Sequence, residues 1–69
     1  MLITVNGETK EIDEGANLSD LLEALDLKPE RLAIELNRKI IRRVNWLSTT
    51  LNEGDKIEIV HFVGGGSLA

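Results

Sequence analysis

The chain has 69 residues, a formal net charge of −4 and no cysteine. A chain this short forms a single domain that buries only about 60% of the surface exposed in its unfolded state, which excludes a deep enzyme cleft. It holds a single histidine, so neither disulfides nor the usual zinc site can stabilise it. Its hydrophobic residues, 42% of the chain, must therefore supply the core.

The charge pattern bears on partners and location. An acidic domain is poorly suited to a phosphate backbone, and the local exception is one basic cluster: Arg38, Lys39, Arg42 and Arg43. This cluster fits either contact with an acidic partner surface or a solvated strand edge that resists aggregation. The sequence shows no secretory leader and no apolar run long enough for a bilayer. We expect a cytoplasmic protein that binds no nucleic acid and no membrane.

The first third of the chain predicts a hairpin followed by a helix. Residues 2–5 and 9–12 read as strands joined by Asn6-Gly7, a strong signal for a tight turn. Leucines at 18, 21, 22 and 25 then form one apolar helical stripe. Asn17 is a good N-cap with Asp20 in capping-box position, and Pro29 is expected to end the helix at about residue 27.

The remaining chain predicts further strands. Residues 32–37 alternate and read as a strand, Asn37-Arg38 is a plausible turn, and residues 40–41 form a very short strand. Residues 42–51 are irregular, with Trp46 expected at the edge of the core. Residues 56–62 form the last strand. Residues 64–69 lack periodicity and are expected to be a mobile tail.

This order of elements predicts an α+β fold with one main helix packed across a mixed sheet of four to five strands. With the first and last strands parallel, it is the β-grasp arrangement, with the domain at 1–63 and the tail at 64–69. The predicted core consists of Ile3, Val5, Ile12, Leu18, Leu21, Leu22, Leu25, Leu32, Ile34, Leu36, Ile57 and Ile59.

The last strand has an asymmetry that bears on function. If Ile57 and Ile59 face the core, a period of two places Glu58, Val60 and Phe62 on the other face. Exposed apolar side chains beside a tail suggest a docking surface. The alternative is a strand covered on both faces, or one that twists at its end so that Phe62 is buried.

Three consecutive glycines, Gly64, Gly65 and Gly66, come shortly after this strand. Such a run fits a plain flexible linker. It also fits a reactive tail, because residues without Cβ can pass through a narrow channel and allow close approach of another backbone.

The segment 58–66, Glu-Ile-Val-His-Phe-Val-Gly-Gly-Gly, resembles the C-terminal signature of the ThiS sulfur-carrier family, whose fold is ubiquitin-like. The resemblance covers residues 1–66, including the Asn6-Gly7 hairpin and Gly54-Asp55 before the last strand. It implies a carrier that is a co-substrate, is not itself an enzyme, and binds no cofactor or metal.

The resemblance also implies a reaction sequence. A ThiF-like adenylyltransferase, using ATP and magnesium, would activate the terminal glycine carboxylate. Sulfur from a cysteine desulfurase or another donor would then give a thiocarboxylate that a ThiG-like thiazole synthase uses in thiamine biosynthesis. By position, Gly66 would carry the sulfur, Gly64 and Gly65 would thread into the partner, and Val60 and Phe62 would dock.

Ser67-Leu68-Ala69 depart from the family pattern, which usually ends at the glycine. Three explanations stay open: a precursor trimmed by a peptidase, residues left by recombinant expression, or a protein that is no longer activated. Trimming after Gly65 would shift the acceptor by one residue. The rival functions are a MoaD-like or other β-grasp sulfur carrier and a ubiquitin-like interaction module with an inert tail. The lone His61 indicates a sheet residue rather than a catalyst, and the free protein is expected to be monomeric.

Overall fold

The protein begins with a β-hairpin. The structure, a computed structural model, describes residues 1–62, so the predicted tail at 64–69 lies outside the described residues. Strands β1 (Leu2–Val5) and β2 (Glu8–Glu11) pair antiparallel with Val5 opposite Glu8. The two residues between them, Asn6 and Gly7, have φ of 50° and 84°, as a type I′ turn requires. The predicted hairpin is confirmed, with its second strand starting one residue earlier than expected.

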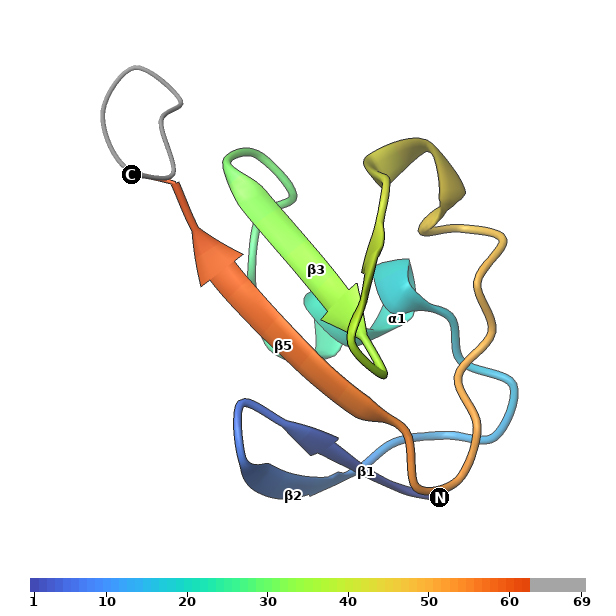
Figure 1. The fold of residues 1–69 in the computed structure, drawn as a ribbon. Coiled ribbons are helices and arrows are strands. Elements are labelled where there is room, and N and C mark those ends of the chain that lie inside the picture. The colour runs from blue at the N-terminus through green and yellow to red at the C-terminus, as the bar shows by residue number, and fades with distance from the viewer. Residues whose placement is uncertain (63–69) are drawn as a thin grey trace.

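Five strands form one mixed sheet in the order β2-β1-β5-β3-β4 (Figure 1). Strand β5 (Lys56–His61) lies in the middle, parallel to β1 and antiparallel to β3 (Leu32–Leu36). Strand β4 (Lys39–Ile41) pairs with β3 and forms one edge. The parallel first and last strands confirm the predicted ubiquitin-like β-grasp fold.

The helix α1 (Leu18–Ala24) begins as predicted and ends earlier than predicted. The Asp20 amide donates to Asn17 Oδ1 at 2.7 Å, and the Asn17 amide donates to Asp20 Oδ2 at 2.9 Å, which completes the capping box. At the other end, Asp26 adopts a φ of 58°, and the Leu27 amide donates to the Leu22 carbonyl at 2.9 Å. This Schellman-type ending stops the helix three residues before the predicted position, so Pro29 is not the cause.

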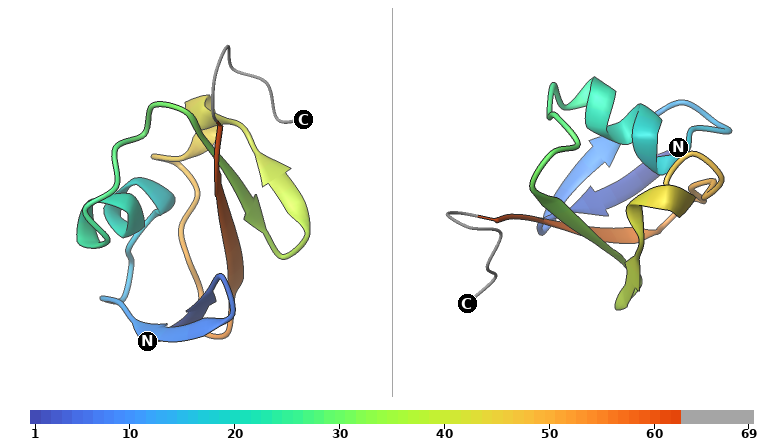
Figure 2. Two further views of the ribbon diagram at one scale, coloured as in Figure 1. Left: turned by 90° about the vertical axis from the view of Figure 1, so that its left-hand side faces the viewer. Right: turned by 90° about the horizontal axis from the view of Figure 1, so that it is seen from above.

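Helix α1 lies on one face of the sheet and leaves the other face uncovered (Figure 2). The fully buried side chains between the two layers include Ile3, Leu18, Leu21, Ile34 and Ile57. Nine of the predicted core residues are buried. The other three, Ile12, Leu25 and Leu36, are partly buried against that core.

The sequence-based core was incomplete in the segment predicted to be irregular. Leu51 is fully buried, and Trp46 is only 3% exposed, so the expected position of Trp46 at the edge was wrong. Trp46 follows the short 3₁₀-helix η1 (Arg43–Asn45), and its indole Nε1 donates to the Ile41 carbonyl at 2.8 Å. The indole ring thus fills the core while its N–H is satisfied by the neighbouring edge strand.

Candidate functional site

Strand β5 is the element that leads to the predicted tail, and it is held along both sides. On the β1 side, the amide of Ile59 donates to Asn6 Oδ1 at 2.8 Å, and Asn6 Nδ2 donates to the Ile59 carbonyl at 3.3 Å. On the β3 side, the Lys56 amide donates to Asn37 Oδ1 at 2.9 Å. Each asparagine side chain bonds the backbone of β5 at a point where the neighbouring strand has turned away from it. The turns at Asn6 and Asn37 therefore both hold β5 in position.

The alternation predicted along β5 is confirmed. Ile57 and Ile59 are buried under helix α1, and Glu58 and Val60 lie on the uncovered face. Val60 is 50% exposed, as the alternation predicts, and its docking role stays a prediction. It lies opposite Ala33 on β3.

A shallow cavity of about 120 Å³ opens on this uncovered face. It is lined by Ala33, Ile34, Glu35, Ile40, Glu58 and Val60. Ala33, Glu35 and Ile40 were not singled out from the sequence as site residues. The alternation of residues 32–37 could have identified Ala33 and Glu35. Because Leu32 and Ile34 point toward the core, a period of two places Ala33 and Glu35 on the outer face. Ile40 is 68% exposed and completes the apolar wall.

Glu35 and Glu58 lie directly opposite each other on β3 and β5. Like charges in this position are unfavourable. Neither carboxylate forms a salt bridge with another side chain within residues 1–62. The outer face therefore combines an apolar hollow with two facing carboxylates, and Arg38 and Lys56 line an adjacent hollow together with those carboxylates.

The end of β5 differs from the prediction at Phe62. The strand ends at His61, and Phe62 is half-buried rather than freely exposed. The Phe62 amide donates to the Arg31 carbonyl at 2.8 Å, which fastens this end of the chain to the loop before β3. Phe62 thus matches the alternative in which the strand end turns inward. Its docking role stays a prediction, and the predicted acceptor Gly66 with Gly64 and Gly65 lies outside the described residues.

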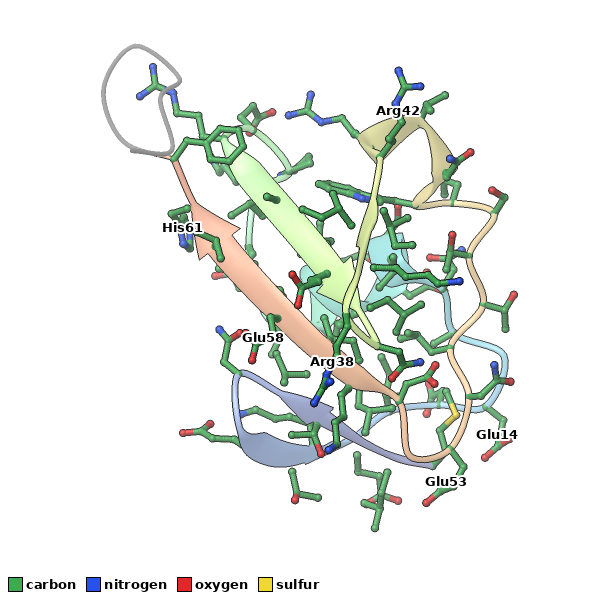
Figure 3. The ribbon with its side chains drawn as sticks, viewed as in Figure 1. Glu14, Arg38, Arg42, Glu53, Glu58 and His61 are labelled. Carbon is green, nitrogen blue, oxygen red and sulfur yellow. The ribbon has the colours of Figure 1, made fainter. Side chains whose placement is uncertain are left out.

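Other features of residues 1–62 offer little chemistry. A hollow of about 480 Å³ is an open depression between helix α1 and the loop after β2, lined by Asp13, Glu14, Asp20 and Glu23 among others. Asp20 is engaged in the helix cap. No group of three or more potential metal ligands occurs within the described part of the chain. His61 is exposed at the end of β5, and Figure 3 shows it far from Glu14 and Glu53, with Glu58 as the nearest labelled carboxylate.

Comparison with known sequences decides the family. The sequence profile of the ThiS family matches residues 3–66, nearly the whole chain and through the last of the three glycines. The chain belongs to the ThiS family. The sulfur carrier protein ThiS of Bacillus subtilis is 35% identical over 66 residues, which cover 94% of this chain and 100% of that protein.

Two further matches are a solved structure of a ThiS protein and a longer protein of which one part is similar to this chain. A crystal structure of the ThiS thiamine biosynthesis protein from Geobacter metallireducens superposes with a TM-score of 0.84 at 37% identity, covering 94% of this chain and 99% of that one. A thiazole synthase from Magnetococcus marinus is 41% identical over 66 residues, which cover 96% of this chain. The chain spans about a fifth, 20%, of that synthase.

Membership in the ThiS family confirms the resemblance drawn from segment 58–66 and the ubiquitin-like fold. The relatives of similar length from Bacillus subtilis and Escherichia coli are named sulfur carrier protein ThiS. No helix within the described residues is long and apolar enough to cross a membrane.

Proposed function

We propose that this protein is a sulfur carrier in thiamine biosynthesis that bears sulfur as a thiocarboxylate on Gly66. The observation that carries the proposal is the ThiS match over residues 3–66, which ends on the predicted acceptor. A second observation supports the proposal: strand β5, which precedes the glycines, is held by hydrogen bonds on both sides. The names of the relatives, sulfur carrier protein and thiazole synthase, agree with this role.

The chemistry requires a free carboxylate at Gly66. One of its oxygens attacks the α-phosphorus of ATP, pyrophosphate leaves, and the acyl carbon becomes part of a mixed anhydride. A sulfide-level nucleophile then displaces AMP; where a cysteine desulfurase or another donor holds the sulfur as a persulfide, a thiol reductant must supply the two electrons that cleave the S–S bond. The displaced AMP retains that oxygen, so the product holds sulfur in its place. A ThiF-like adenylyltransferase supplies the nucleotide site and the magnesium, and the carrier supplies only the acyl group.

Two features of the carrier would present that acyl group. Gly64 and Gly65 lack side chains and can enter a channel too narrow for other residues. The outer face of β5, with Val60 at its centre, would dock against the adenylyltransferase and a ThiG-like thiazole synthase. The chain continues with Ser67-Leu68-Ala69, so activation at Gly66 requires removal of these three residues.

Intact mass spectrometry tests the acceptor directly. A chain ending at Gly66 is incubated with the adenylyltransferase, ATP, magnesium and a sulfur source, beside chains ending at Gly65 and at Ala69. We expect only the Gly66 form to show one oxygen replaced by sulfur. Conversion of the Gly65 form alone would move the acceptor by one residue. If no form is converted, the carrier role is wrong.

The docking role of Val60 is tested by Val60→Asp. Aspartate removes the apolar contact and places an unpaired carboxylate in the interface, which should lower the rate of sulfur loading by about tenfold. Leu2→Asp is the matched control, because Leu2 is 49% exposed and lies on β1 rather than on β5. Equal loading by both variants with unchanged melting temperatures would remove Val60 from the docking surface.

A further inference from the structure

A second exposed surface, chemically unlike the outer face of β5, lies at η1. It consists of Val44 and Leu47 with Arg42 and Arg43, and we call it the η1 patch. Val44 is 77% exposed and Leu47 is 75% exposed, the highest values among the large apolar side chains described. Val44 lies within η1 (Arg43–Asn45), and Leu47 follows three residues later in the turn that continues from it.

The η1 patch rests on a rigid base. Trp46, between the two exposed residues, is buried, and its indole is bonded to the Ile41 carbonyl. The Arg43 guanidinium lies 5.9 Å from the centre of the Trp46 ring and donates to the Pro29 carbonyl at 2.9 Å. A fixed apolar pair that binds nothing within the fold loses little conformational freedom when a partner covers it, which favours binding.

The charge around the η1 patch is opposite to that of the protein as a whole. The patch itself contains the guanidinium groups of Arg42 and Arg43, and residues 36–52 contain no acidic residue, whereas Arg38 lies away from the patch beside Glu58. Figure 3 places Arg42 at the opposite end of the molecule from Glu14 and Glu53. The Arg42 end therefore carries a local positive charge, which favours the approach of a negative partner surface at that end.

That end is also the one from which the chain continues toward the glycines. Arg43 bonds the carbonyl of Pro29, and the Phe62 amide bonds the carbonyl of Arg31. The same short loop before β3 thus contacts both η1 and the end of β5. Docking through the η1 patch would bring the end of β5 toward the partner at the same time.

We infer that the η1 patch is a second docking surface, which fits an acidic protein surface with an apolar hollow, and that thiazole synthase presents that surface. The choice of partner rests on the proposed function and on the relatives in which a segment like this chain forms part of a thiazole synthase. Nucleic acid fits poorly, because Trp46 is buried and cannot stack on bases. A membrane fits poorly, because the patch has two apolar residues and no long amphipathic helix.

The experiment measures binding of the full chain to the thiazole synthase of the same organism by surface plasmon resonance, at about 50 mM and about 0.5 M salt. Arg42→Glu should slow association by about tenfold at low salt and much less at high salt, because the effect is long-range steering. Lys10→Glu makes the same charge change on β2 and should have little effect. Arg43 is kept, since it contacts Trp46 and Pro29.

The apolar part is tested with Val44→Ser combined with Leu47→Ser, which should raise Kd by roughly tenfold and mainly speed dissociation. Leu2→Ser is the control. Unchanged melting temperatures exclude misfolding as the cause. Each variant is also assayed for sulfur loading as a Gly66-ending chain. Normal loading and normal synthase binding by both variants would overturn the η1 patch and leave the carrier role intact.

Three other outcomes would overturn the assignment. Loss of loading without loss of synthase binding would assign the patch to the adenylyltransferase instead. Binding of the wild-type chain to anionic vesicles or single-stranded RNA that Arg42→Glu abolishes, with synthase binding unchanged, would make the patch a membrane or nucleic-acid site. A wild-type chain that is not loaded and does not bind the synthase would overturn both proposals together.

Discussion

The turn at Asn6-Gly7 and the turn at Asn37-Arg38 flank strand β5 from opposite sides. Both have two central residues with positive φ, and both use an asparagine first. They differ in the groups that the asparagine bonds and in the second residue of the turn. Asn6 satisfies both the N–H and the carbonyl of Ile59, while Asn37 accepts from Lys56 and donates to Asp55 Oδ1 at 3.0 Å. Gly7 suits its conformation, and Arg38 adopts a φ of 72° with a full side chain.

The two turns therefore hold strand β5 in different ways. At Asn6 the bonded groups belong to a residue that is only 7% exposed, so water cannot easily replace the asparagine. At Asn37 the bonds lie at the surface, and water is available. The first turn is therefore expected to contribute more to stability, although both contribute to the position of the strand that precedes the glycines.

The largest effect is expected from Asn6→Ala. It leaves the Ile59 N–H and carbonyl without their partners and places a Cβ residue without a polar side chain at a φ of 50°. The free energy of unfolding should fall by about 2–4 kcal/mol, measured by urea denaturation. Asn6→Gly tolerates the φ and isolates the hydrogen bonds. If Asn6→Gly unfolds at the wild-type urea concentration, the bonds to Ile59 contribute nothing.

A smaller effect is expected from Asn37→Gly. This change keeps a residue that accepts a φ of 50° and removes only the bonds to Lys56 and Asp55. Because water can solvate the exposed groups, the loss should be about 1 kcal/mol. Hydrogen exchange of the Lys56 amide gives a local readout, and faster exchange there is expected. A loss as large as that of Asn6→Gly would contradict the distinction between the two turns.

These turns also show how far the sequence alone reaches. Asn-Gly between alternating residues predicted the first turn, because both central positions need positive φ. The bonds from Asn6 to Ile59 were not predicted, because they join residues 53 apart in the chain. Local patterns carry no information about such partners. The alternation of β5 predicted the exposure of Val60, since a period of two is enforced wherever one face is buried.

The errors have one local cause and one that depends on the whole fold. Pro29 suggested a helix end, but Asp26 in a left-handed conformation stopped the helix earlier. Leu51 and Trp46 lie in a segment without periodicity, so their burial depended on how the chain returns over the sheet. The η1 patch could not be read from the sequence for the same reason. Once Trp46 turns inward, Val44 and Leu47 must turn outward, and only the fold shows which of the three is buried.

The smallest effect, and the only one expected to stabilise the protein, comes from Arg38→Gly. A left-handed conformation costs an ordinary residue about 1–2 kcal/mol, and glycine avoids this cost but loses more backbone entropy on folding. The balance should be a gain of roughly 0.5 kcal/mol in the free energy of unfolding.

Gly7→Ala is the mirror experiment, because a Cβ at Gly7 would meet nothing within 4 Å and any loss reflects its φ of 84° alone. We expect that loss to be about 1 kcal/mol. If Arg38→Gly instead destabilises the protein while Gly7→Ala behaves as expected, the Arg38 side chain stabilises the β3–β4 edge by more than its backbone strain costs.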